Sequence, residues 1–215
     1  GLRFLNAYSA APVCTPSRGA IFSGKYPART KLTTVFAGPA GPDDRLFDKS
    51  KYRGEKDQVL EARHRHVMPK SEILLPQALA EGGYATGFFG KWHIGECPGY
   101  YPDQRGFQVA KGYRIKAVPT AQSGHWMKTF HKYCAHLEGA NPDAYVAEVL
   151  TDECAAFISR NRNRPWFAFL SHYLVHSPIQ PMPDKLKYYK NKPTTDQNNP
   201  GYAAMVESVD DSVSR

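Results

Sequence analysis

Two short apolar runs, each followed by polar residues, constrain the fold of this chain more than any other feature. Tyr84–Phe89 leads into a Gly-Lys-Trp-His sequence at 90–93, and Trp166–Leu170 leads into residues 172–176, which carry two histidines. Runs of this length and density are typical of strands buried on both faces of a parallel sheet. Helices are predicted at Ile73–Glu81, Asp143–Arg160 and Tyr202–Val213. Strands followed by helices indicate an α/β layer fold, in which ligands gather at the carboxyl ends of the strands.

The start of the chain is predicted to contain a third strand that is followed by polar residues and a helix. Leu2–Tyr8 is predicted to form a short strand, followed by a turn of small residues. A helix is then expected with Thr15 as its N-cap and Pro16 in its first position, ending at Gly24. Cys14 would lie at this strand-to-helix turn, next to the amino end of the helix.

Two long segments carry weak signals for regular structure. Residues 35–70 are polar and broken by glycines and prolines, so they are predicted to run outside the core. Residues 97–140 are irregular and aromatic. Both are interpreted as loop-rich excursions from one domain that spans residues 1–215.

The composition excludes several classes of protein. Hydrophobic residues make up 41% and charged residues 22% of the 215 residues, which argues against intrinsic disorder. The longest apolar stretch, Trp166–Val175, is interrupted by His172 and is shorter than the roughly 18 residues of a membrane span, so no span is expected. The net charge of +8 favours an anionic partner: nucleic acid, anionic lipid, or a sulfated or phosphorylated substrate. The four cysteines show no Cys-x-x-Cys spacing, which argues against a zinc knuckle and leaves a disulfide open.

Five residues that follow the predicted strands could act together on an anion. A helix start attracts anions and lowers a thiol pKa, and Arg18, one turn after Cys14, would bring a guanidinium to the same end. Lys91 could supply a charge, and His93, two residues later, could transfer a proton. His176 follows a buried strand and could serve as a general acid. Taken singly, a structural cysteine, an exposed lysine and structural histidines are open alternatives.

Three motifs connect these candidates to a known family. Cys14-Thr15-Pro16-Ser17-Arg18, followed by Gly19, resembles the first signature of the formylglycine-dependent (type I) sulfatases, Cys-x-Pro-Ser-Arg. Residues 83–93 resemble the second signature, G-Y-x-T-x-x-x-G-K-x-H, at every fixed position, and His176-Ser177-Pro178 resembles a His-x-Pro landmark. The resemblance covers nearly the whole chain. It implies the alkaline-phosphatase-like superfamily, with a mixed, mainly parallel sheet sandwiched by helices, of which residues 1–215 would be an internal fragment truncated at both ends.

The resemblance also implies a mechanism. A formylglycine-generating maturation enzyme would oxidise Cys14 to formylglycine, and its hydrated aldehyde would attack the sulfur of a sulfate ester. Arg18 would hold the hydrated aldehyde, Lys91 the sulfate and His93 a formylglycine hydroxyl, while His176 would protonate the leaving alcohol. A divalent cation, usually Ca²⁺, would bind sulfate and the oxygen of the modified Cys14. The compartments implied by the family are periplasmic, secreted or lysosomal.

The acidic metal ligands of the family have no evident counterparts here. Sulfatases supply an Asp-Asp pair ahead of the first signature, but residues 1–7 contain no acid. They supply a second acidic pair and a second lysine well after the His-x-Pro landmark; Asp210 and Asp211 lie near the end of this chain and are expected to be solvated. We therefore expect the fragment to bind calcium poorly and to turn over slowly or not at all.

Three functions follow from this reading. The leading one is hydrolysis of a sulfate ester, with a sulfated carbohydrate as the expected substrate. A phosphate or phosphonate monoester hydrolase of the same fold is the alternative enzyme. A catalytically inactive fragment that binds a polyanion is the non-enzyme alternative, supported by the positive charge and by aromatic residues that could stack on sugars, Tyr100, Tyr101, Tyr113 and Trp126. No nucleic-acid motif is recognised, so nucleic acid is not an expected partner.

Overall fold

A three-stranded parallel sheet forms the centre of the molecule. The computed structural model describes residues 3–35, 46, 62–115, 124–194, 196 and 198–215. Strand β1 (Ala85–Gly90) lies in the middle, between β2 (Val109–Lys111) and β3 (Trp166–Ser171), and both pairings are parallel. The carboxyl ends of all three strands therefore meet at one edge of the sheet.

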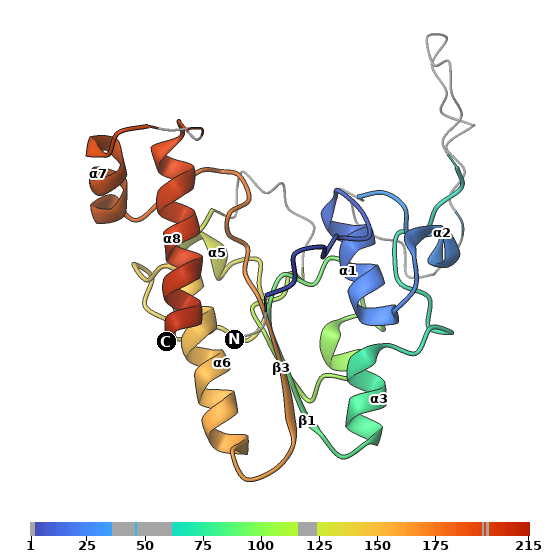
Figure 1. Cartoon of the computed structure of the whole chain (residues 1–215). Coiled ribbons are helices and arrows are strands. Elements are labelled where there is room, and N and C mark those ends of the chain that lie inside the picture. The colour runs from blue at the N-terminus through green and yellow to red at the C-terminus, as the bar shows by residue number, and fades with distance from the viewer. Residues whose placement is uncertain (1–2, 36–45, 47–61, 116–123, 195, 197) are drawn as a thin grey trace.

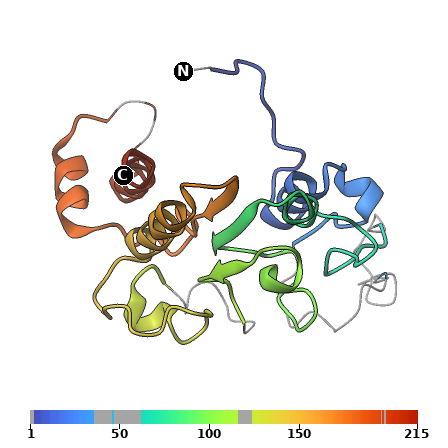
Figure 2. The same cartoon turned by 90° about the horizontal axis from the view of Figure 1, so that it is seen from below.

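Helices cover both faces of this sheet. Helix α6 (Val146–Asn161) packs against β1 and β3, with α8 (Pro200–Ser214) outside it, while α1 (Cys14–Ser23) and α3 (Leu75–Glu81) lie on the other side (Figures 1 and 2). Four further helices are described: α2 (Pro27–Thr30), the 3-10 helix η2 (Pro102–Gln104), α5 (Met127–Phe130) and α7 (Pro183–Asn191).

The alternation of side chains along β1 explains why two cores form. Phe88 packs with Phe22 of α1 in one buried cluster, and its neighbour Phe89 packs with Leu150 and Phe157 of α6 in the other. Successive residues of a strand point to opposite faces, so the continuous apolar run buries both. Every residue of β1 is buried, whereas five of the six residues of β3 are half-buried or exposed, because β3 is an edge of the described sheet.

The α/β fold predicted from the sequence is confirmed, and its main elements lie within three residues of their expected bounds. The predicted strand at the start of the chain is wrong over the described residues 3–8: they pair with no strand, and Phe4 and Tyr8 are 74% and 87% exposed. Part of the 35–70 segment is core after all, since Val67 and Met68 are completely buried. The 97–140 segment is likewise more than surface loop. It contributes β2 and several fully or nearly buried side chains, among them Phe107, Tyr113, Met127 and Phe130.

Candidate active site

Cys14 is the first residue of helix α1. Its predecessor Val13, the N-cap, is extended (φ −128°, ψ 159°) and no side chain caps the helix, so the predicted capping role of Thr15 is wrong. Thr15 is buried within the first turn, and its hydroxyl has no hydrogen-bond partner in the described part of the chain. The amino end of α1 thus keeps backbone N–H groups available for an anion next to Cys14, which is partly exposed.

Ser17 fixes the turn that precedes this helix. Its hydroxyl lies 2.6 Å from the carbonyl oxygen of Ala11 and 2.8 Å from that of Val13, and it accepts a hydrogen bond from the hydroxyl of Ser9. These contacts hold residues 9–13 against the first turn of α1. The serine of the first motif therefore has a structural explanation: it sets the direction in which the chain arrives at Cys14.

Arg18 joins α1 to the carboxyl ends of two strands. One guanidinium nitrogen, Nη1, donates to the carbonyl oxygen of Lys91 and to the hydroxyl of Ser171, each at 2.5 Å, and the Ser171 hydroxyl donates to the same Lys91 carbonyl at 2.8 Å. Lys91 directly follows β1, and Ser171 ends β3. Residues separated by 73 and 153 positions in the sequence are thereby brought together.

Lys91 lies deep in this junction. Its backbone N–H donates to the carbonyl of Ser171 at 2.8 Å, and the residue is 9% exposed. Burial lowers the pKa of its ammonium below the usual 10.5, the charges of Arg18 and Arg114 lower it further, and Cys14 and Glu96 act in the opposite direction. Burial also lowers the pKa of Arg18, with Cys14 again opposing. Cys14 therefore lies within electrostatic range of both cations.

His93 lies on the same segment as Lys91, and Trp92 between them fixes the segment. Trp92 is completely buried among aromatic residues, and its indole N–H donates to the carbonyl of Tyr100 at 2.9 Å. His93 adopts a left-handed conformation (φ 62°), which few residues other than glycine adopt. The buried Trp92 therefore fixes the turn after β1, between Lys91 and His93 in the sequence.

His176 is the most loosely held of the predicted site residues. It is exposed, and its Nδ1 lies 2.9 Å from the carbonyl of Ser177. Its own backbone carbonyl contacts Nε2 of the buried His125 at 2.8 Å. Among the residues that the structure describes, the side-chain contact stays within its own loop, the backbone contact reaches His125, and neither joins the His176 side chain to Cys14.

Sequence reasoning missed two charged residues beside the site. Arg114, three residues after β2, is 9% exposed, and its Cζ lies 5.5 Å from the ring centroid of Tyr173. Glu96, after β1, is the acid that acts on Arg18, Lys91 and Arg114, and burial raises its pKa against their influence. Both follow strands of the parallel sheet, but β2 is only three residues long and gave no recognisable pattern.

The described residues around Cys14 do not fit a calcium ion. Calcium takes six to eight oxygen ligands, preferably from several carboxylates. The charged groups that act on one another here are Arg18, Lys91 and Arg114, with Glu96 as their one acidic partner. Over the described ranges, no three His, Cys, Asp or Glu side chains are grouped to hold a metal. Asp211 does not belong to such a cage, because it pairs with Lys185 on the surface.

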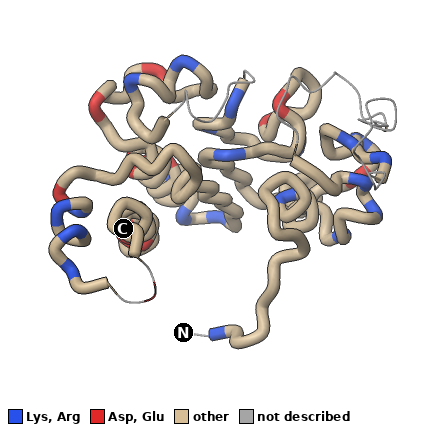
Figure 3. Tube along the Cα trace, turned by 90° about the horizontal axis from the view of Figure 1, so that it is seen from above, with Lys and Arg blue, Asp and Glu red and all other residues tan. Residues whose placement is uncertain are grey.

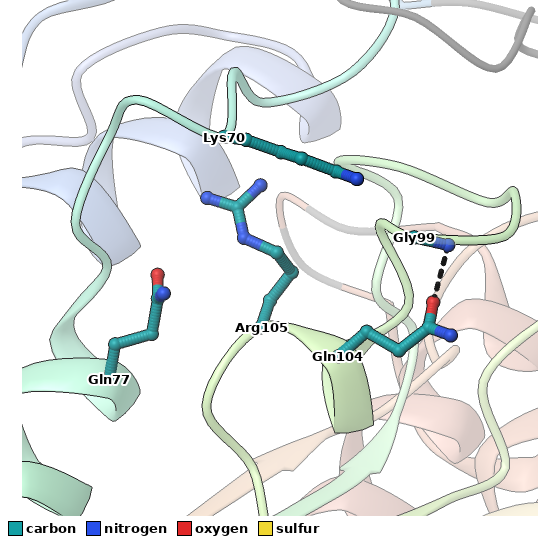
Figure 4. Close-up of a pocket in the computed structure, with 5 residues that line it drawn as sticks. All are labelled: Lys70, Gln77, Gly99, Gln104 and Arg105. Atoms are coloured by element: carbon teal, nitrogen blue, oxygen red, sulfur yellow. Dashed lines mark hydrogen bonds between the residues drawn. The ribbon is translucent and has the colours of Figure 1, made fainter.

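A separate pocket of about 370 Å³ lies between the residues before α3 and helix η2 (Figure 4). Its lining includes Arg105, whose guanidinium donates to the carbonyls of Met68, Pro69 and Glu72 at 2.8 to 3.1 Å. On the other side Gln104 accepts from the N–H of Gly99 at 2.6 Å. Both side chains hold loop backbone in place, so this pocket is explained by packing.

Comparison with known proteins agrees with the geometry. The family model described as Sulfatase matches residues 1–215. Human N-acetylgalactosamine-6-sulfatase is 27% identical over all of this chain, which spans 39% of that protein. The chain thus covers well under half the length of the curated relatives it matches. No described helix is long and apolar enough to cross a membrane.

Solved structures share the fold. A crystal structure of Ps i-CgsB in complex with k-i-k-neocarrahexaose has a TM-score of 0.68 at 23% identity, covering 96% of this chain and 44% of that one. A structure of BT4656 with its substrate D-glucosamine-2-N,6-O-disulfate has a TM-score of 0.55 at 20% identity, covering 92% and 32%. With the family model matched from end to end, and with its sheet, helices and Cys14–Arg18 junction in place, the chain belongs to the sulfatase family.

Proposed function

We propose that the protein of which this chain is part hydrolyses sulfate esters, and that Cys14 is the residue at which the reaction takes place. The observation that carries the proposal is the Arg18 bridge, which connects the first turn of α1 to the Lys91 backbone and to Ser171. It gathers a helix amino end and buried cations at one edge of the sheet, where the anionic, tetrahedral sulfate group of an ester is stabilised.

Formylglycine at position 14 would supply a hydrated aldehyde as nucleophile, which an unmodified thiol cannot provide. In this proposal Arg18 orients the oxygens at position 14, because its guanidinium is already fixed by Lys91 and Ser171. The Lys91 ammonium binds the sulfate oxygens and offsets the charge that grows on the ester oxygen. His93 holds a hydroxyl at position 14, and His176 delivers the proton to the leaving alcohol.

The proposed substrate is a sulfated carbohydrate. Support comes from the curated relative that acts on N-acetylgalactosamine-6-sulfate by its name, and from a protein of the same fold that takes a disulfated glucosamine as its substrate. The complete second motif, from Gly83 to His93, favours sulfate over phosphate esters.

The test uses the full-length protein, produced together with a formylglycine-generating enzyme. A peptide mass map over residues 4–18 is expected to show the aldehyde or its hydrate at position 14. Turnover of 4-nitrophenyl sulfate is expected to exceed that of 4-nitrophenyl phosphate. Cys14→Ala should lower kcat/KM by about 10³-fold or more because the nucleophile is lost, whereas Cys154→Ala, at a buried thiol in α6, should retain activity. An intact thiol at position 14 in an active enzyme would refute the assignment.

A further inference from the structure

Helix α7 presents an unusually basic outer surface. Lys187, Lys190 and Lys192 are exposed, and Tyr188 between them is 59% exposed. We call these four residues the α7 basic face (Figure 3 shows the lysines of this helix in blue). None of the nine residues of α7 is buried, so the core does not explain their identity.

The lysines of this face form no ion pair in the described structure, although Asp184 lies one turn before Lys187 on the same helix. On the inner side of α7, Lys185 pairs with Asp211 and lies 4.0 Å from Glu207, both on α8. Within the described part of the chain, no carboxylate forms an ion pair with Lys187, Lys190 or Lys192. Lys187 and Lys190 lie three positions apart, where like charges destabilise a helix. The helix dipole favours Lys190 in the last turn but gives no reason for Lys187.

The aromatic residue of this face is arranged differently from those singled out in the sequence as possible sugar contacts. Tyr100 and Tyr113 are 4% and 3% exposed, so they belong to the core, while Tyr101 and Trp126 are half-buried. Tyr188, in contrast, offers its ring to solvent, and the Lys192 ammonium lies 5.8 Å from the ring centroid. An exposed aromatic ring beside ammonium groups suits a ligand that combines sugar rings with anions.

The α7 basic face lies at the same end of the molecule as the candidate active site. Figure 1 shows α7 at the end where α1 begins and where the chain leaves β3. Helix α7 begins at Pro183, seven residues after His176, so the chain itself limits their separation to about 25 Å. Because the proposed function places the leaving alcohol at His176, the further units of a bound glycan extend from there toward this helix.

We propose that the α7 basic face binds the sulfate groups of a sulfated polysaccharide outside the reacting sugar. The proposal rests on the proposed function for its substrate class, and it makes the protein a hydrolase of polymeric or oligomeric sulfated glycans. Three ammonium groups supply the attraction, and Tyr188 supplies a surface for a sugar ring. Such binding weakens as salt rises, because the contacts are exposed ion pairs.

The test compares two triple variants of the full-length protein in a Cys14→Ala background, which removes turnover. One variant is Lys187→Gln/Lys190→Gln/Lys192→Gln; the matched control, Lys31→Gln/Lys128→Gln/Lys132→Gln, removes the same charge from exposed lysines elsewhere. Binding of a fluorescent heparin hexasaccharide is measured at 50 to 300 mM NaCl. We expect about a tenfold loss of affinity and a flatter salt dependence for the α7 variant, and less than a threefold loss for the control.

Single-stranded DNA of equal charge and vesicles of anionic lipid are the competing ligands. Equal losses in both variants, or binding of either competitor as tight as that of heparin, would overturn the proposal. With Cys14 intact, kcat/KM for 4-nitrophenyl sulfate should be the same in the α7 variant and the parent, since a small ester does not reach α7. A parent that hydrolyses no sulfate ester would refute the proposed function, while the heparin measurement would still decide the role of α7.

Discussion

Lys91 keeps an ammonium group in a place that favours the neutral amine. Burial is the main reason for its lowered pKa, and the guanidinium groups of Arg18 and Arg114 add to it. The side chain stays buried in the free protein because backbone contacts with Ser171 and Arg18 fix Lys91 at the end of β1. A bound sulfate group would raise the pKa of Lys91 again, because a nearby negative charge favours the ammonium form.

The pH dependence of catalysis follows from this residue. Deprotonation of Lys91 removes the charge that binds sulfate, so kcat/KM is expected to fall on the basic side at a pH below 10.5, where a free lysine titrates. In Lys91→Arg the guanidinium stays protonated, so the basic limb of the pH profile should move to higher pH. The maximal kcat/KM should be lower, because the planar guanidinium contacts sulfate with a different geometry than an ammonium. pH profiles of kcat/KM for both proteins check this. An unchanged basic limb in the variant would assign the titration to another group.

At the scale of elements, the junction of β1 with the site depends on Gly90. Its φ of 115° lies outside the range of ordinary side chains, and a Cβ there would come within 2.0 Å of the Ser171 carbonyl oxygen. That carbonyl accepts the Lys91 N–H, so the close approach of β1 and β3 is also what positions Lys91. Gly90 of the second motif is thus required by the backbone conformation, independently of any role in the reaction.

Replacement of Gly90 by alanine should therefore destabilise the protein by more than about 3 kcal/mol, because a backbone clash adds to the strain of a positive φ. Gly83→Ala is the matched control: its φ is 84°, but nothing lies within 4 Å of the added Cβ, so it should cost about 1 kcal/mol. Urea unfolding followed by circular dichroism measures both. Equal losses of unfolding free energy would show that the contact with Ser171 has relaxed and that strain alone matters.

At the scale of the whole molecule, the cationic junction and the net charge of +8 of this chain favour the binding of anions. Sulfate should raise Tm more than chloride at equal ionic strength, because a ligand that binds only the folded state stabilises it. Sulfate also stabilises proteins generally, so the difference between variants is the informative quantity. Lys91→Gln should lose most of the specific shift, and Lys128→Gln, at an exposed lysine, should keep it. Identical shifts in the two variants would mean that sulfate does not bind at the junction.

Local sequence patterns predicted much of the fold. The buried run of β1, the helical spacing of α6 and the glycine after α1 each reflect contacts with neighbours in sequence or with one face of a layer. The strand predicted at Leu2–Tyr8 failed because its alternation is not matched by a partner strand in the described structure. The short strand β2 and the buried Val67 and Met68 were missed, because contacts distant in the sequence stabilise them: β2 pairs with β1, Met68 packs in the cluster of Phe22 and Phe88, and Val67 packs with Cys97 and Tyr100.

The sequence by itself determined the α/β class, which follows from periodicity and spacing, and it carried the motifs whose resemblance to the sulfatases implied the residues able to handle a sulfate. Tertiary structure decided which of those residues meet. The Arg18 contacts with Lys91 and Ser171, and the presence of Glu96 and Arg114 beside them, arise from the parallel packing of three strands whose carboxyl ends are far apart along the chain. Contacts of that kind depend on loop closure and on packing across layers, which no local pattern encodes.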